Sequence, residues 1–320
     1  MQGDSKTVVI AVGGNSLIVD EGRQSIPDQY AAVIETAGAI ADLIADGWTA
    51  VITHGNGPQV GFILRRSEIA LSEVIPVPMD YATADTQGAI GYMFLKALHN
   101  HLRRRGIARP VASVVTQVLV DRRDPAFANP TKPIGAFMDA ATAQQRAAEQ
   151  GWIVREDAGR GWRRVVPSPR PQAIVEIDIL RQLVAAGVIL VACGGGGVPV
   201  YQDEAGDLHG VEAVVDKDYA SALLANELAA DLFAISTGVS QVAVHYNQPG
   251  QRWLTRVTTS ETQTLYAEGH FAAGSMGPKV RAMLDFLARG GKQGVITDPQ
   301  NLRRAVAGEA GTRFVPDPPE

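Results

Sequence analysis

The sequence predicts an α/β fold in which a mostly parallel sheet is covered by helices on both faces. Apolar runs of strand length alternate with helix-like stretches along most of the chain, as in βαβ units. The runs are almost continuously apolar, which is typical of strands buried on both faces. Three of them end in glycine-rich turns, where a parallel strand would lead into the next helix.

The individual elements follow from this alternation in chain order. The expected strands cover residues 7–12, 49–53, 110–117, 188–192, 231–236 and 295–297. The expected helices cover residues 29–45, 59–71, 83–105, 174–186, 220–230 and 279–288.

Residues 121–171 break the alternation and predict a small α+β subdomain that projects from the sheet. The segment holds a proline-rich stretch at 129–133, a short helix near 139–150, and two strand-like pieces that flank a hairpin signal at 157–161. Clusters of charge usually form a solvated face. We expect this for the arginines of the segment, which are Arg155, Arg160, Arg163, Arg164 and Arg170.

Composition bounds the class of protein. The 320 residues are 46% hydrophobic, enough for a large core, and 29 basic against 34 acidic residues give a net charge of −5. A nucleic-acid-binding protein would usually be basic, so no nucleic-acid partner is expected. The only cysteine, Cys193, cannot form an internal disulfide, which fits a reducing compartment.

Membrane insertion and secretion are not expected either. The first ten residues lack the basic and long apolar regions of a signal peptide. Residues 183–202 carry no charge, but the glycines at 194–197 and Pro199 favour a buried strand followed by a turn over a membrane span. We therefore expect a cytoplasmic protein without a membrane partner.

The three glycine-rich turns predict one anion-binding site. They end the runs VVIAVGGN at 8–15, VITHGNGPQVG at 51–61 and VILVACGGGG at 188–197. Strand-to-helix turns of this kind present backbone N–H groups to anions, and the carboxyl ends of parallel strands share one edge. Neither the Walker A loop nor the G-x-G-x-x-G fingerprint is present.

Three lysines strengthen the case for a phosphate-like ligand. Lys217 lies between Asp216 and Asp218, immediately before an expected helix for which an aspartate is available as N-cap. Lys279 follows Pro278, which suits a first helical position, and Lys132 lies between a threonine and a proline in an otherwise irregular loop. A lysine at a helix N-terminus opposes the helix dipole unless an anion is near. Together the lysines predict charge neutralisation of a phosphoryl group in transfer.

Seven segments spread over nearly the whole chain form a recognisable set: VGGN at 12–15, THGNGPQVG at 53–61, TQGAIGYM at 86–93, NPTKPIG at 129–135, GGGGVPV at 194–200, GVEAVVDKDYAS at 210–221 and FAAGSMGPKV at 271–280. The combination of NPTKPIG, the four glycines and the DKD triplet in this order is highly specific. On these segments the chain resembles the carbamate kinase family of the amino acid kinase superfamily.

The resemblance implies an open αβα sandwich with the amino acid kinase fold, a homodimer, and reversible Mg²⁺-dependent phosphoryl transfer between ATP and carbamate. In the reverse direction, ADP and carbamoyl phosphate give ATP and carbamate, which breaks down to CO₂ and ammonia. A single domain over 1–320 is implied. Its amino-terminal half, about 1–205, includes the subdomain and holds the carbamoyl group; its carboxyl-terminal half, about 206–320, holds the nucleotide.

Site residues follow from the resemblance, position by position. Lys217 and Lys279 would hold the nucleotide phosphates and the transferring group, Lys132 would reach in from the subdomain, and Asp218 would orient the lysines. The N–H groups expected to bind carbamoyl phosphate belong to Gly13, Gly14, Asn15, Gly55, Asn56 and Gly57. The residues expected around the ATP or ADP are Gly195, Gly196, Thr237, Tyr246, Met276 and Pro278, although core packing explains Tyr246 and Met276 equally well.

The implied chemistry explains why no general base stands out. Carbamate is already an anionic oxygen nucleophile, so no proton has to be removed, and the barrier is repulsion between two anions plus alignment. His54 could serve as a base or ligand, but it is more readily explained as part of its turn. No His, Cys and carboxylate cluster with metal-ligand spacing is found, so Mg²⁺ is expected to bind through phosphate oxygens.

Two alternative functions remain open, and the sequence departs from the family pattern at three places. The same fold could phosphorylate another small carboxylate, although no surplus arginine lies beside the amino-terminal loops to bind an amino acid, or it could bind ligand as a sensor without turnover. The departures are Ser16 in place of alanine, the stretch 245–251, and Asp298-Pro299. They concern nucleotide affinity and substrate preference, and none replaces one of the three lysines.

Overall fold

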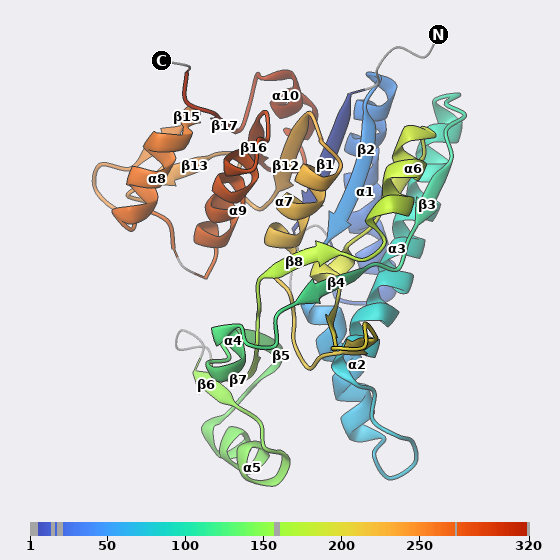
Figure 1. The fold of residues 1–320 in the computed structure, drawn as a ribbon, viewed down its shortest axis with the longest axis vertical. Helices are drawn as coiled ribbons and strands as arrows, with labels where there is room; N and C mark the ends of the chain where they lie inside the picture. The colour runs from blue at the N-terminus through green and yellow to red at the C-terminus, as the bar shows by residue number, and fades with distance from the viewer. Residues whose placement is uncertain (1–5, 14–16, 18–21, 157–160, 273, 319–320) are drawn as a thin grey trace.

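An eight-stranded sheet forms the centre of the molecule in the computed structural model, which describes residues 6–13, 17, 22–156, 161–272 and 274–318. The strand order is β15-β17-β16-β12-β1-β2-β9-β3 (Figure 1). Every neighbouring pair is parallel except β16 and β17. The strands are β1 Thr7–Val12, β2 Thr49–His54, β3 Val111–Ser113, β9 Ile189–Val191, β12 Leu232–Ser236, β15 Arg256–Thr258, β16 Gly294–Thr297 and β17 Thr312–Val315. The predicted mostly parallel α/β sheet is therefore confirmed.

Helices cover both faces of this sheet, as predicted. Successive strand residues alternate between two cores: in β12, Phe233 and Ile235 face one helical layer, while Leu232 and Ala234 face the other. The first layer contains α6 Ile177–Ala185, α7 Lys217–Glu227, α8 Thr259–Ala267 and α9 Met276–Ala288. The second contains α1 Ile26–Ala45, α3 Met79–Arg104 and α10 Leu302–Ala307.

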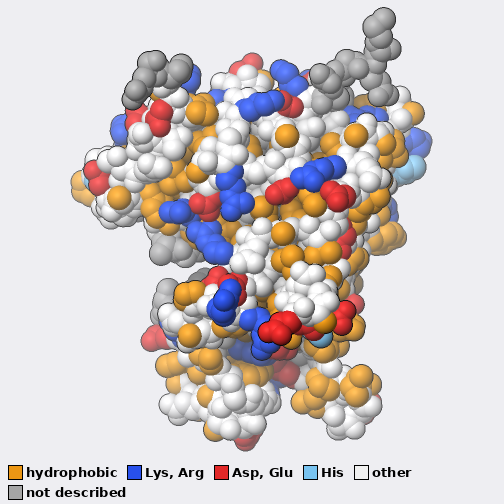
Figure 2. All heavy atoms as spheres, in the orientation of Figure 1, with side chains coloured by type: hydrophobic (Ala, Val, Ile, Leu, Met, Phe, Trp, Pro, Cys, Tyr) orange, Lys and Arg blue, Asp and Glu red, His pale blue; other side chains and the backbone are white. Residues whose placement is uncertain are grey.

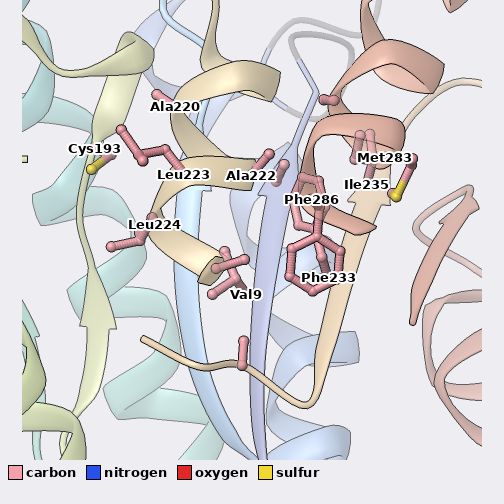
Figure 3. Packing of buried hydrophobic residues seen from close by; sticks show 14 of the residues in the cluster. Val9, Cys193, Ala220, Ala222, Leu223, Leu224, Phe233, Ile235, Met283 and Phe286 are labelled. Carbon is pink, nitrogen blue, oxygen red and sulfur yellow. The ribbon is translucent and has the colours of Figure 1, made fainter. Parts of the chain in front are cut away.

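Packing beneath α7 and α9 fixes the helices that carry two of the three lysines. Figure 3 shows Phe286 of α9 against the strand residue Phe233, and Leu223 of α7 pointing toward Cys193. The rings of Phe233 and Phe286 are 5.5 Å apart in an edge-to-face arrangement, which adds about 1 kcal/mol to the burial itself. Both helices are therefore held firmly over β1 and β12.

The expected strand at 110–117 is wrong, because the chain changes sheets within it. Residues 111–113 form β3 of the central sheet, whereas β4 Gln117–Val120 belongs to a second sheet of order β11-β10-β4-β8. The Gln87 side chain accepts from Thr116 N at 2.7 Å and donates to Thr116 O at 3.1 Å. These bonds replace the strand pairing that would have continued β3. The other strands of the second sheet are β8 Pro171–Ile174, β10 Val198–Gln202 and β11 Leu208–Gly210.

The predicted subdomain projects from the body of the molecule (Figure 1). Its antiparallel sheet has the order β5-β7-β6. Its elements are α4 Pro125–Ala128, β5 Lys132–Met138, α5 Ala140–Gln150, β6 Val154–Glu156 and β7 Trp162–Val166. Lys132 is thus the first residue of a strand rather than part of an irregular loop. Of the hairpin signal, only Gly161 lies among the described residues.

The subdomain arginines do not all form one solvated face. Arg155 contacts Asn129, and Arg164 pairs with Glu212 at 3.3 Å. Arg170 lies apart from them, because its guanidinium pairs with Asp285 of α9 at 2.9 Å. Arg160 lies outside the described residues.

Capping explains why two helices begin earlier than predicted. α1 starts after Ser25, whose hydroxyl and Asp28 form a capping box, and Pro27 lies in the first turn. α7 starts at Lys217 because the Asp216 carboxylate caps it. The remaining elements are α2 Gly57–Ile69, β13 Val242–Val244, β14 Arg252–Leu254 and the short 3-10 turn η2 Gly194–Gly196. Among the described residues, no helix is both long and apolar enough to cross a membrane.

Candidate active site

The three glycine loops meet at one edge of the central sheet. They follow β1, β2 and β9, and Thr237 follows β12, which is also parallel to β1. Gly13 N–H donates to Ser236 O at 2.9 Å, and a Cβ added at Gly13 would lie 2.9 Å from the same oxygen. Only glycine therefore allows the loop after β1 to approach β12 this closely.

Two expected anion donors are already used by the backbone. Gly13 N–H binds Ser236 O, and Gly55 N–H donates to Val12 O at 3.1 Å. The expectation that these two groups donate to the ligand is therefore corrected, because both N–H groups already donate to carbonyl oxygens of the neighbouring strands. Asn56 and Gly57 remain suitable, because Gly57 begins α2 and the first N–H groups of a helix have no preceding turn to bind. Gly14, Asn15 and Ser16 lie outside the described residues.

Gly195 and Gly196 lie in η2, packed against the loop after β2 rather than facing open space. Gly195 has a positive φ of 68°, and a Cβ there would lie 2.0 Å from Asn56 Nδ2. Asn56 in turn donates to Thr86 Oγ1 at 2.9 Å. A Cβ at Gly196 would lie 2.2 Å from Val215 O, just before the DKD triplet. Both glycines are buried and bring these loops together.

His54 ends β2 inside this junction and is neutral there. Its side chain is 1% exposed, and its Nδ1–H donates to Gly55 O at 3.0 Å, which leaves Nε2 unprotonated. Burial lowers the pKa of His54 to about 4, partly opposed by the Gly55 hydrogen bond, while the charge of Lys217 lowers it further. Nε2 is buried and has no hydrogen-bond partner among the described residues. His54 therefore supports the turn.

Two lysines share one buried aspartate at the N-terminal ends of α7 and α9. Lys217 Nζ lies 2.6 Å from Asp218 Oδ1, and Lys279 Nζ lies 3.0 Å from Asp218 Oδ2. The side chain of Asp218 is 4% exposed, against 12% and 17% for the lysines. One carboxylate thus holds both ammonium groups close to each other.

The third lysine reaches the same place from the subdomain. Lys132 Nζ lies 2.7 Å from Asp216 Oδ2. The other oxygen, Oδ1, accepts from Asp218 N at 2.9 Å and caps α7. The three lysines are therefore brought together on two aspartates that are two residues apart, which we name the lysine–aspartate cluster: Lys132, Asp216, Lys217, Asp218 and Lys279.

The charges of the cluster favour a bound anion. Burial raises the pKa of the Asp218 carboxyl, but Lys217 and Lys279 outweigh it and hold that pKa well below its usual range. Burial lowers the pKa of Lys217, Asp218 opposes this, and Lys279 adds to it. Three ammonium groups against two carboxylates leave one positive charge in excess, beside two helix N-termini.

Hydroxyl groups tie Lys217 to the end of β2. Ser221 Oγ donates to Lys217 O at 2.5 Å, so Thr53 Oγ1, at 2.6 Å, donates to Ser221 Oγ. This link between the sheet edge and α7 was not predicted, because hydroxyls leave no pattern in the sequence. The pairing of Asp216 with Lys132 was missed because the two residues are far apart in the sequence, which indicated only an aspartate N-cap.

The other residues expected around the nucleotide follow β12 and β13 or lie at the start of α9. Met276 begins α9, with Pro278 and Lys279 in its first turn. Tyr246 follows β13, is 53% exposed, and lies edge-on to Trp253 with ring centroids 6.3 Å apart. Thr237 donates its N–H to Thr297 O at 2.8 Å. Exposure favours a surface role for Tyr246, whereas Met276 packs against the core.

The protein itself offers Mg²⁺ few ligand atoms, so a bound phosphate would have to supply most of them. Among the described residues, no three His, Cys, Asp or Glu side chains gather as a metal site. Both oxygens of Asp216 and of Asp218 already accept hydrogen bonds. The cluster therefore fits Mg²⁺ only where phosphate oxygens supply most of its ligands.

Comparison with known proteins decides the family. The amino acid kinase family model matches residues 6–298. The chain belongs to the amino acid kinase family. It is 50% identical to the carbamate kinase of Pyrococcus horikoshii, over 97% of this chain and 99% of that one. It is 48% identical to the carbamate kinase-like protein YahI of Escherichia coli, over 96% and 98%.

Solved structures agree with these relatives. Carbamate kinase from Giardia lamblia bound to AMP-PNP superposes on this kinase with a TM-score of 0.92 and 41% identity, covering 99% of this chain and all of that one. The expected amino acid kinase fold and the resemblance to carbamate kinases are therefore confirmed.

Proposed function

We propose that this kinase catalyses reversible phosphoryl transfer between ATP and carbamate. The observation that carries the proposal is the full-length identity of about half to curated carbamate kinases. The geometry supports it, because three ammonium groups meet at the edge of the sheet where parallel strands place ligands.

In this proposal the cluster lowers the repulsion between two anionic reactants. A carbamate oxygen attacks the γ-phosphorus of ATP while the bond to the β-phosphate oxygen breaks, giving carbamoyl phosphate and ADP. Lys217 and Lys279 hold the phosphates, Lys132 neutralises the transferring group, and Asp218 keeps two of the lysines in place. Because carbamate is already an anion, the neutral His54 is not needed as a base.

Each half of the molecule would bind one of the two ligands. The first turn of α2, with Asn56 and Gly57, donates N–H groups to the carbamoyl phosphate. ATP or ADP lies toward Thr237, Tyr246 and Met276, as AMP-PNP binding by the Giardia relative suggests. Mg²⁺, when bound with the nucleotide, neutralises phosphate oxygens. The lone buried Cys193 suits a cytoplasmic enzyme.

We also propose that the kinase is a homodimer. Helix α3 exposes Tyr81 and Tyr92 at 66% and 61%, and large exposed aromatic side chains are typical of interface residues. Sedimentation velocity on the wild type and Tyr92→Lys tests this. We expect a dimer that the variant weakens; a monomeric wild type would refute it.

A coupled assay tests the reaction. ATP formation from ADP and carbamoyl phosphate is followed with and without Mg²⁺, beside a panel in which ATP is offered carbamate, acetate and glutamate. We expect ATP formation that requires Mg²⁺, and ADP release with carbamate well above the other carboxylates. Preference for another carboxylate would change the substrate, and nucleotide binding without any turnover would indicate a sensor.

A further inference from the structure

A second cationic site lies outside the lysine–aspartate cluster, in a cleft between α7 and α9. The cleft holds about 290 Å³ and reaches the start of β8, and none of the three cluster lysines lines it. Its polar side chains are Arg170, Tyr219, Asn226, Arg281, Asp285 and Arg289.

The charge of the cleft is unbalanced. Three arginines face a single acidic residue, Asp285, so the lining carries two positive charges in excess. Figure 2 shows basic side chains gathered over α7 and α9 with an acidic side chain between them. Such a surface favours an anion with two negative charges.

Arg170 and Arg281 are fixed by hydrogen bonds but keep N–H groups that can bind a ligand. Asp285 Oδ2 accepts from Arg170 Nη1, and Asp285 Oδ1 accepts from Arg281 Nε, each at 2.9 Å. Because a guanidinium has five N–H groups, most donors of both arginines remain. Their side chains are 47% and 46% exposed, so a ligand can reach them.

Two further features fit a ligand in this place. The Arg170 guanidinium lies 3.6 Å from the centroid of the Tyr219 ring, which fixes its plane. Asn226 lines the cleft, and its buried Nδ2 has no hydrogen-bond partner in the part of the chain that the structure describes. Apart from Asp285, whose oxygens are both used, the charged lining consists of donors only. The floor is apolar, with Ala222 and Leu223.

We propose that this cleft binds the phosphate group of a small phosphorylated molecule. A phosphate dianion matches the excess charge, and its oxygens match the planar donors of Arg170 and Arg281 and the charge of Arg289. The ligand would bridge α7 and α9, the helices that carry Lys217 and Lys279. A ligand bound in the cleft would therefore affect the distance between those two lysines.

Titration calorimetry with inorganic phosphate, at constant ionic strength, tests the site. The full-length wild type is compared with Arg281→Gln/Arg289→Gln, which alters the cleft, and with Lys217→Gln/Lys279→Gln, which alters the cluster. We expect the phosphate Kd of the cleft variant to rise at least about tenfold. The cluster variant should keep a phosphate site of nearly wild-type affinity.

A matched control removes the same charge elsewhere. Arg103 and Arg104 are exposed at the end of α3, in the helical layer across the sheet. Arg103→Gln/Arg104→Gln should leave the Kd within about twofold of wild type. The proposal is overturned if the cleft variant binds phosphate as the wild type does, if the cluster variant loses all binding, or if the control weakens binding as strongly as the cleft variant.

Discussion

Asp216 shows how one side chain can serve two elements. One carboxylate oxygen caps α7 and the other holds Lys132 of the subdomain. The two roles can be separated, because asparagine is as good an N-cap as aspartate but carries no charge for a lysine. Alanine removes both.

Asp216→Asn should therefore lower kcat for ATP formation about tenfold while changing the free energy of unfolding by less than about 1 kcal/mol, since the pair with Lys132 is partly exposed. Asp216→Ala should cost about 1 kcal/mol more in stability through the lost cap. Steady-state kinetics and urea unfolding measure both. If Asp216 acts through Lys132, Asp216→Asn should lower kcat little further in a Lys132→Ala background. If instead the two substitutions lower kcat by independent factors that multiply, this role of Asp216 is contradicted.

His54 predicts a pH dependence of stability. Its pKa is about 4 in the folded protein against an ordinary 6.5, so the unfolded chain binds a proton first as the pH falls. Stability is therefore complete above pH 6.5 and is lost as the pH falls toward 4. Between pH 7 and pH 5 the loss from this residue should be about 2 kcal/mol.

Urea unfolding of the wild type and His54→Asn at both pH values measures this contribution. The wild type should lose about 2 kcal/mol more than the variant, because the variant lacks the titrating ring. Equal losses in both proteins would show that His54 titrates normally in the folded state. The comparison holds even though the variant is less stable at either pH.

Among the elements, β5 and α2 determine where the subdomain lies. A Cβ added at Gly61 of α2 would lie 2.9 Å from the Gly135 Cα of β5. A backbone atom cannot turn aside as a side chain does, so Gly61→Ala must push the two elements apart. Lys132 begins the same strand and would move away from Asp216.

Gly61→Ala should thus lower the free energy of unfolding by about 1–3 kcal/mol and reduce kcat several-fold. Thermal unfolding and the ATP-forming assay measure the two effects. With Lys132 already replaced by alanine, the kcat effect of Gly61→Ala should largely disappear. A persistent kcat loss would mean that the subdomain acts on turnover in some other way.

Elements with a strong pattern were predictable from the sequence, and those fixed by tertiary contacts were not. The apolar runs of β1, β2 and β12 and the long helices α1 and α3 follow from local patterns. By contrast, the chain leaves the central sheet after β3 because a distant side chain, Gln87, binds Thr116. Nothing local to 110–117 signals that change.

The same division holds for the site. Lysines at helix starts and glycines at strand ends are visible in the sequence, so Lys217, Lys279 and the glycine loops could be proposed from it. Whether a loop N–H faces a ligand or a neighbouring strand depends on pairing across the sheet, and this corrected Gly13 and Gly55. The position of Arg170 beside α9 depends on the path of the whole chain.

At the scale of the whole molecule, one continuous sheet brings the site together. β1 lies between β2 and β12, so loops from the amino-terminal and carboxyl-terminal parts of the chain meet at one edge. A rigid sheet holds two anionic reactants at a fixed separation, which lowers the cost of alignment. The subdomain adds Lys132 from outside the sheet.

The central claim is that ammonium groups brought to this edge carry phosphoryl transfer, and kcat for ATP formation from ADP and carbamoyl phosphate in Lys217→Ala and Lys279→Ala tests it most directly. Lys292→Ala is the matched control, since Lys292 is 66% exposed and pairs with Asp231 away from the cluster. We predict that each cluster variant loses on the order of 10³ or more in kcat and that the control keeps wild-type turnover. Wild-type turnover in both cluster variants would contradict the account.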